Sequence, residues 1–226
     1  MAILLIKVIK KRVFLLSRHV LQNPGLYARG ASRWSVPRLF ARMESWAVHI
    51  PLLADLYSLP YRRVVAREIQ LAGIGPDDRV LNIGCGAVPF TAIHLARMAG
   101  CRVTALDIDP AAVRKASLLI RRAGLSDQVT ILEGDGASDI RQGFDVAVVA
   151  LQVRPKAGVL MELGRRGGRG SRAVFREPSE WCRGQYDCLG SLERLGSSQI
   201  NHRMGALDRS VLVDLRLCPE DMEVAG

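Results

Sequence analysis

The sequence predicts an α/β fold with a seven-stranded, mostly parallel and twisted sheet, flanked by helices and preceded by an N-terminal helical extension. Short apolar runs alternate with helix-like stretches from residue 61 onward, which is typical of a parallel sheet with crossover helices. Two further strand-like runs follow one another near the C-terminus, and they predict a closing antiparallel pair. The 226 residues, 49% of them hydrophobic, suffice for one well-packed domain with appendages.

The expected elements follow one another in a regular order. Strands are expected at residues 79–84, 101–108, 128–135, 144–151, 171–177, 197–204 and 210–217, and helices at residues 61–74, 89–100, 109–125 and 156–166. The arginine- and glycine-rich run at residues 165–172 is interpreted as a basic loop. Residues 22–60 contain four prolines, which favour short helices joined by turns because proline tends to begin or end an element. Residues 1–60 are therefore predicted to be a helical extension or cap, and residues 61–226 the main domain.

Composition narrows the classes of partner. The net charge of +10 comes mostly from arginines spread along the whole chain, so a nucleic-acid partner is not indicated. The five cysteines contain no C-x-x-C pair, which indicates neither a disulfide framework nor a metal site. This cysteine usage fits a reducing cytoplasm.

The first 21 residues are apolar but interrupted by basic side chains. Lys7, Lys10 and Lys11 break the apolar run well before the ~20 residues that a membrane-spanning helix needs. The basic residues also follow the apolar run, which is the reverse of a secretory signal. The segment is interpreted as an amphipathic helix that packs on the main domain or on a second subunit, as in a homodimer. The alternative is weak contact with the inner face of a membrane.

The stretch VLNIGCGAVPFTAI (residues 80–93) places Gly84 and Gly86 in a turn between a predicted strand and a predicted helix. Glycine allows a ligand to approach the backbone closely and allows the dihedral angles of such a turn. The next two predicted strands end at Asp107 and Asp135, and the carboxyl ends of parallel strands lie at the edge where ligands bind. A carboxylate there can accept hydrogen bonds from ribose hydroxyls. The three features together predict a nucleoside-shaped ligand.

Two nearby residues refine this prediction. A dinucleotide fingerprint needs a third glycine, and Pro89 occupies that position, so a nicotinamide cofactor is disfavoured. Asp109 is instead expected to cap a helix, because Pro110 follows it at a natural first helical position.

The ordered runs VLNIGCG, VTALDID, ILEGDG and FDVAVVA resemble the motifs of the class I S-adenosylmethionine-dependent methyltransferases, which have a Rossmann-like fold. The resemblance covers roughly residues 61–217 and implies S-adenosyl-L-methionine as the cofactor. It implies that the turn lines the methionine part, that Asp107 binds the ribose hydroxyls and that Asp135 lies near the adenine. The implied cofactor-binding residues are Asn82, Gly84, Cys85, Gly86, Asp107, Ile108, Asp135 and Gly136. Asn82 departs from the family, which often has an acidic residue there, and an amide supplies no charge.

A narrower resemblance concerns the nicotianamine synthase branch of this fold. Its glycine turn is also followed by a proline-containing loop and a Thr-[Ala/Ser]-Ile helix start, here Pro89 and Thr91 to Ile93. The later runs ALQVRPKAGVLMEL and VFRE are similar to that branch through Lys156 and Arg176. Members of that branch transfer the aminobutanoyl group of the same cofactor to an amine and release methylthioadenosine.

Three functions remain open at this point. The first is methyl transfer to a small-molecule acceptor, the second is aminobutanoyl transfer of the nicotianamine synthase kind, and the third is non-catalytic binding of the cofactor or of a membrane surface. The sequence contains no unmistakable catalytic base. Tyr57, Tyr61 and Glu68 are candidates for the acceptor side, because elements before the first strand often cover the pocket in this fold.

Overall fold

The computed structural model describes residues 51–217, with side chains for residues 61–216 other than Arg203. The predicted segment at residues 1–21, and with it the question of membrane contact, lies outside the described residues. The helices are α3 (Pro51–Ala72), α4 (Phe90–Ala99), α5 (Pro110–Arg122) and α6 (Lys156–Arg166). The strands are β1 (Arg79–Ile83), β2 (Arg102–Asp107), β3 (Val129–Glu133), β4 (Val146–Val149), β5 (Arg172–Pro178), β6 (Gly196–Met204) and β7 (Leu207–Asp214). Short 3-10 turns η2 (Glu180–Gln185), η3 (Gly190–Leu195) and η4 (Leu215–Leu217) complete the described chain.

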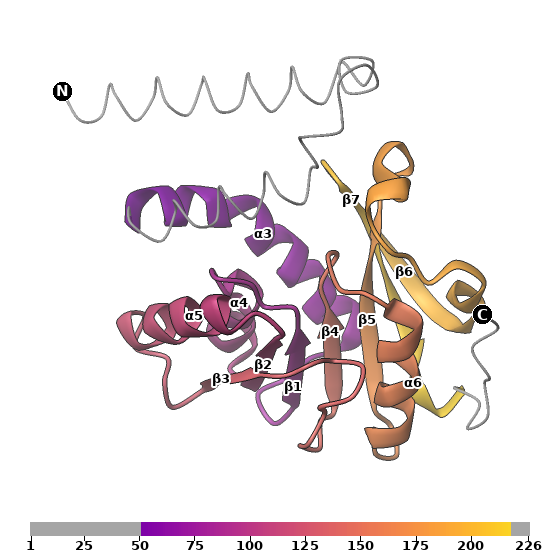
Figure 1. Ribbon diagram of the computed structural model, residues 1–226, viewed down its shortest axis with the longest axis horizontal. Helices are drawn as coiled ribbons and strands as arrows, with labels where there is room; N and C mark the ends of the chain where they lie inside the picture. The colour runs from indigo at the N-terminus through magenta and orange to yellow at the C-terminus, as the bar shows by residue number, and fades with distance from the viewer. Residues whose placement is uncertain (1–50, 218–226) are drawn as a thin grey trace.

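The seven strands form one sheet in the order β3-β2-β1-β4-β5-β7-β6, with β3 at one end and β6 at the other (Figure 1). The first five strands along the chain pair in parallel, whereas β7 is antiparallel to both β5 and β6. This confirms the predicted mostly parallel sheet and its closing antiparallel pair. Strand order reverses between β1 and β4, and the carboxyl ends of strands at such a switch point are where ligands bind in open α/β sheets.

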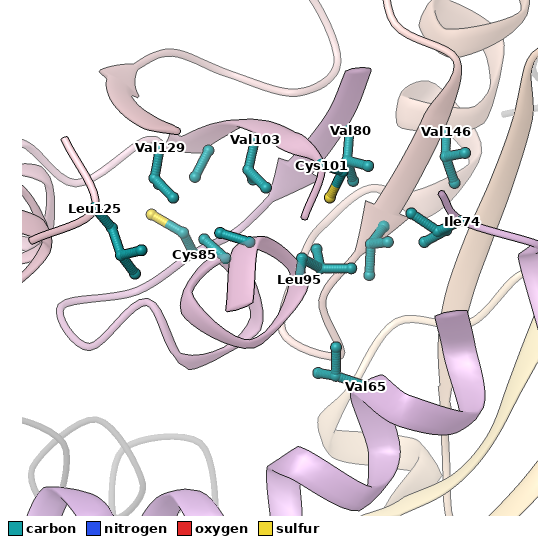
Figure 2. Packing of buried hydrophobic residues seen from close by; sticks show 14 of the residues in the cluster. Val65, Ile74, Val80, Cys85, Leu95, Cys101, Val103, Leu125, Val129 and Val146 are labelled. Carbon is teal, nitrogen blue, oxygen red and sulfur yellow. The ribbon is translucent and has the colours of Figure 1, made fainter. Parts of the chain in front are cut away.

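Apolar side chains cover both faces of the sheet. On one face, α3, α4 and α5 pack on β1 to β5 around residues such as Val65, Val80 and Leu95, which lie together in Figure 2. On the other face, Leu160 and Leu163 of α6 pack on Phe175 and the strands beside it. Successive residues of β5 therefore alternate between the two faces, as expected for a strand that is buried on both sides.

Local hydrogen bonds and backbone conformation determine where the helices begin and end. Asp109 caps α5, because its Oδ1 accepts a hydrogen bond from the amide of Ala111 at 2.8 Å, and Pro110 is the first helical residue. This confirms the predicted cap. Helix α4 ends at Gly100, whose left-handed backbone (φ 71°) closes the last turn. Residues 167–171 form the expected loop between α6 and β5.

Helix α3 differs from the prediction. It begins at Pro51 and not at residue 61, so it runs through Pro60 and across the predicted boundary between extension and main domain. The expectation that each proline ends or begins an element is therefore wrong at Pro60. In Figure 1 the helix changes direction along its length, as expected where a proline removes a hydrogen bond from the helix. No helix in the described part of the chain is long and apolar enough to cross a membrane.

The core makes a testable prediction about packing. Leu95 of α4 is 0% exposed, whereas Leu118 of α5 is 36% exposed. We expect Leu95→Ala to lower the free energy of unfolding by about 2–5 kcal/mol, because it removes buried methyl groups and leaves a cavity. Leu118→Ala is the matched control and should change it by only about 0.5 kcal/mol. Urea denaturation of both variants measures this, and equal losses would contradict the assigned core.

Candidate functional site

The glycine turn lies at the carboxyl end of β1. Gly84 and Gly86 both have left-handed backbone conformations (φ 76° and 68°), which residues other than glycine rarely adopt. A Cβ on Gly84 would also lie 2.5 Å from Cγ2 of Val153, so the loop after β4 covers this part of the turn. The amides of Gly84 and Cys85 both donate to the carbonyl of Leu106, at 2.9 and 3.0 Å. The turn is thus fixed against the end of β2.

Asp107 joins the turn to the second strand. Its Oδ2 accepts a hydrogen bond from the amide of Gly86 at 2.6 Å, and its Oδ1 accepts one from the amide of Asp109 at 3.0 Å. Each carboxylate oxygen can accept more than one hydrogen bond, so the group can also bind hydroxyls. The side chain is only partly buried, as a ligand-binding carboxylate requires.

Ile108 follows Asp107 and is 69% exposed, although it is a large apolar residue. It is one of three large hydrophobic side chains exposed in the described residues, together with Leu118 and Trp181. Its position beside the ribose-binding candidate gives a planar base an apolar surface to lie against. The predicted place of Ile108 in the cofactor site fits this exposure.

The loop after β3 reaches the same edge. A Cβ on Gly136 would lie 2.4 Å from Cγ2 of Ile83, so this loop packs directly on the end of β1. Asp135 accepts a hydrogen bond from the amide of Ala137 at 2.9 Å, and its own amide donates to Asp139 at 3.1 Å. Asp135 therefore shapes the loop through its carboxylate, and Gly136 allows the close approach.

Two of the predicted binding residues have buried side chains. Asn82 is fully buried, and its Nδ2 donates to the carbonyl of Val148 at 3.1 Å. Its Oδ1 has no hydrogen-bond partner among the described residues, which leaves a neutral acceptor beneath the turn. The side chain of Cys85 belongs to the hydrophobic core, so Cys85 contributes its backbone to the turn.

The acceptor-side candidates come from α3. Tyr57 is part of this helix, but its side chain is outside the described part of the structure. The ring of Tyr61 stacks on that of Phe90, with centroids 5.7 Å apart. Phe90 is the first residue of α4, directly after the proline-containing loop, so Tyr61 lies beside the segment that leaves the glycine turn.

Glu68 forms a buried ion pair. Its two oxygens accept hydrogen bonds from Nε and Nη2 of Arg176 in β5, both at 2.8 Å. Ser210 of β7 donates to the same carboxylate at 2.7 Å, and its hydroxyl lies 2.9 Å from Nε2 of His202 in β6. The network therefore joins α3 to three strands. Sequence reasoning missed Ser210 and His202, because a single serine or histidine in a strand carries no signal of its own.

The protonation state of Glu68 follows from this network. Burial alone would raise the pKa of the carboxyl, but the charge of Arg176 and the hydrogen bonds from Arg176 and Ser210 outweigh it and hold the pKa below its usual range. Burial alone would also lower the pKa of Arg176, and the charge of Glu68 reverses this. Glu68 is thus an ionised carboxylate held by three hydrogen bonds, a state suited to positioning α3 and unsuited to accepting a proton.

The described residues contain no cluster of three or more histidine, cysteine, aspartate or glutamate side chains that could hold a metal ion. None of the cysteines in the described part of the chain, Cys85, Cys101, Cys182 and Cys188, forms a disulfide. Burial raises the pKa of Cys101 to about 11 and also raises that of Cys182.

Comparison with known proteins agrees with this geometry. Residues 80–165, which include the glycine turn, Asp107 and Asp135, match the model of a family described as a methyltransferase domain. This part of the chain is therefore similar to methyltransferase domains. This confirms the superfamily that the sequence motifs resemble.

Three curated relatives illustrate the range of similar proteins. An L-histidine 2-aminobutanoyltransferase of Yersinia pestis is 33% identical over 54% of this chain and 46% of its own length. A protein of the same name in Pseudomonas aeruginosa is 29% identical over 71% of this chain and 65% of its own length. A sterol 24-C-methyltransferase of Eremothecium gossypii is 42% identical, but over only 28% of this chain and 17% of its own length. This chain therefore spans about half to two thirds of the aminobutanoyltransferases that it matches.

Solved structures support the fold. MtNAS, a nicotianamine synthase, crystallised with MTA and tNA, has a TM-score of 0.68 and 23% identity, covering 80% of this chain and 71% of its own. A point mutant of MtNAS in complex with S-adenosylmethionine has a TM-score of 0.67 and 19% identity over 80% of this chain and 74% of its own. An RNA methyltransferase of Salinibacter ruber with S-adenosyl-L-homocysteine reaches 0.55 at 23% identity, over 71% of this chain and 96% of its own.

The buried ion pair makes a prediction about stability and pH. We expect Glu68→Gln to lower the free energy of unfolding at pH 7 by about 3–5 kcal/mol, because it leaves the Arg176 charge buried without its partner. Asp145→Asn is the control: it breaks the largely exposed Arg79–Asp145 pair and should cost less than about 1 kcal/mol. Urea denaturation measures both changes.

The same pair fixes the direction of the pH dependence. A carboxyl whose folded pKa is lowered stabilises the protein fully above its unfolded pKa, here near 4.5, and this contribution is lost as the pH falls through the lower folded value. The stability difference between wild type and Glu68→Gln should therefore shrink on acidification below that value. An unchanged difference between pH 7 and pH 3 would contradict the assigned ionisation.

Proposed function

We propose that this protein uses S-adenosyl-L-methionine to transfer its aminobutanoyl group to the amine of a small-molecule acceptor, with L-histidine as the first acceptor to test. The observation that carries the proposal is the extent of the similarity. The proteins named L-histidine 2-aminobutanoyltransferase match up to 71% of this chain, whereas the matches to proteins named methyltransferases cover between 28% and 40% of it. The MtNAS structures also share its fold over about 80% of the chain. The similarity therefore extends beyond the residues that match the methyltransferase family.

The residues at the glycine turn fit the proposed cofactor. Asp107 can accept hydrogen bonds from two ribose hydroxyls, and Ile108 offers the adenine an apolar face. Gly84 and Gly86 let the methionine part lie against the backbone. The unpartnered Oδ1 of Asn82 supplies a neutral acceptor beneath the turn for a bound water or an ammonium group.

The bound cofactor supplies a sulfonium that activates its three attached carbon atoms towards nucleophiles. The task of the protein is to hold one nucleophile in line with one carbon, about 3–3.5 Å away, and to exclude water. In aminobutanoyl transfer the acceptor nitrogen bonds to the methylene carbon of the amino-acid arm, the carbon–sulfur bond breaks, and its electron pair leaves with the sulfur of methylthioadenosine. The nitrogen must arrive without its extra proton and gives up a further one.

The elements beside the glycine turn position the acceptor. Tyr61 of α3 stacks on Phe90 at the start of α4, and Val153 lies over Gly84, so both border the place where the amino-acid arm would lie. Glu68 is buried and its carboxylate already accepts three hydrogen bonds from Arg176 and Ser210, so its part is to position α3.

Methyl transfer to a small molecule is the second candidate. The sequence motifs taken alone favour it, and so does the methyltransferase family matched by residues 80–165. The two reactions share the cofactor site and differ in which carbon faces the acceptor, so the products distinguish them.

Cofactor binding can be tested with two neighbouring aspartates. We expect Asp107→Ala to weaken the binding of S-adenosylmethionine by at least about tenfold, because it removes the ribose acceptor and the bond to Gly86. Asp109→Ala is the matched control, which removes the cap of α5 and costs about 1 kcal/mol of stability without changing the affinity. Isothermal titration calorimetry measures both, and equal affinities of the two variants would argue against this site.

The product formed from the cofactor identifies which reaction the protein catalyses. Purified protein is incubated with S-adenosylmethionine and L-histidine, and the products are separated by mass spectrometry, with controls that lack protein or L-histidine. We expect methylthioadenosine that depends on both. Protein-dependent S-adenosylhomocysteine would instead support methyl transfer and overturn the proposal.

A further inference from the structure

We propose that Lys156 is a positioning residue of the acceptor side: its buried ammonium group holds the segment after β5 (residues 179–189, the post-β5 segment) in register with the loop that covers the glycine turn. This inference rests on the proposed function, because it assigns a task within that site.

Lys156 is the first residue of α6 and its side chain is fully buried. Its ammonium group donates three hydrogen bonds: to the carbonyl of Arg176 at 2.6 Å, to the carbonyl of Asp187 at 2.8 Å and to Oε1 of Glu177 at 3.2 Å. All three donors of a lysine are thereby used. Its backbone amide also donates to Oδ2 of Asp187 at 2.6 Å. The residue therefore joins the start of α6 to the end of β5 and to Asp187.

Glu177 extends the contact along the post-β5 segment. Besides pairing with Lys156, its carboxylate accepts the amide of Leu189, at 3.3 and 3.4 Å from its two oxygens. Asp187 in turn accepts the amide of Cys188 at 3.0 Å. The Lys156–Glu177 pair thus holds the segment at Asp187 and at Leu189.

The post-β5 segment forms a wall at the ligand-binding edge of the sheet. Cys182 and Tyr186 of this segment pack with Val64 of α3, Leu151 after β4 and Leu207 at the start of β7. The amide of Ser179 donates to the carbonyl of Ala206 at 2.7 Å. These contacts lie beyond the carboxyl ends of β4 and β5, at the same edge as the glycine turn.

The loop between β4 and α6 links this wall to the cofactor site. It spans residues 150–155, ends directly before Lys156, and includes the Val153 side chain that covers Gly84. Lys156 therefore stands where the loop that covers the glycine turn ends, and its side chain binds the wall beside that loop. Their relative position determines which carbon of the cofactor an acceptor on that wall can reach.

The energetics favour a positioning role. A charge removed from water is costly. Burial lowers the pKa of Lys156 and raises that of Glu177, and in each case the opposite charge of the partner offsets only part of this shift. An apolar residue of similar volume often stabilises a fold as well as a buried ion pair does. An apolar residue at position 156, however, has no donor for the two carbonyls and the carboxylate that Lys156 binds.

The test compares Lys156→Met with Arg172→Met. Arg172 also bonds three acceptors, the carbonyls of Ala72 and Gly73 and the carboxylate of Asp78, but at the opposite end of β5. Hydrogen–deuterium exchange is measured on the full chain, together with the Kd of S-adenosylmethionine and the KM of L-histidine. For Lys156→Met we expect at least about tenfold faster exchange confined to the post-β5 segment. We also expect the KM of L-histidine to rise at least about tenfold while the cofactor Kd changes less than about twofold.

The outcomes separate the two proposals. Exchange and KM that match those of Arg172→Met would overturn the role of Lys156, and so would faster exchange spread evenly over the sheet. If wild type forms no methylthioadenosine from L-histidine, the proposed transfer to L-histidine fails, and the exchange measurement still decides whether Lys156 holds the segment. Should Lys156→Met not fold, Asp187→Ala replaces it, because it removes only the two bonds that the partly exposed Asp187 carboxylate accepts, from the amides of Lys156 and Cys188, and should give the same pattern more weakly.

Discussion

Strand β5 carries a buried ion pair on each of its faces, and the arrangement of the ligand-binding edge depends on these two pairs. Arg176 faces α3 and binds Glu68, whereas the next residue, Glu177, faces α6 and binds Lys156. Because successive strand residues point to opposite faces, two adjacent residues can anchor a helix on each side of the sheet. The pairs demand complementary geometry, since a buried charge without its partner is far more costly than an apolar contact that is slightly displaced.

The candidate cofactor site is held in shape mainly by hydrogen bonds of backbone atoms, and not by buried ion pairs between side chains. Gly84, Cys85 and Gly86 are held by the carbonyl of Leu106 and the carboxylate of Asp107, so the turn keeps its shape through bonds to the neighbouring strand. A site that is already ordered loses less conformational entropy on binding. The acceptor side depends on side chains from α3, the loop after β4 and the post-β5 segment, and such elements can vary between related proteins while the turn stays the same.

Much of this structure could be predicted from the sequence, because local patterns determine it. Helix α6 has the predicted bounds, residues 156–166, and Asp109 caps α5 as its neighbour Pro110 indicates. The start of α3 was not predictable in the same way, because a proline at position 60 argues against a continuous helix. The partner of Glu68 was also hidden, since Arg176 lies 108 positions away and no local pattern links them. The sequence identifies residues that carry chemistry, and tertiary contacts decide which of them reach a substrate.

The buried thiols have a consequence for a protein proposed to bind an alkylating agent. A sulfonium compound reacts with thiolates, and a thiol reacts only to the extent that it is ionised. With its pKa raised to about 11, Cys101 is ionised in only about one molecule in ten thousand at pH 7. Cys182 is shifted in the same direction, and Cys85 is enclosed in the core directly beside the turn. Burial of these side chains thus protects the protein from modification by its own group donor.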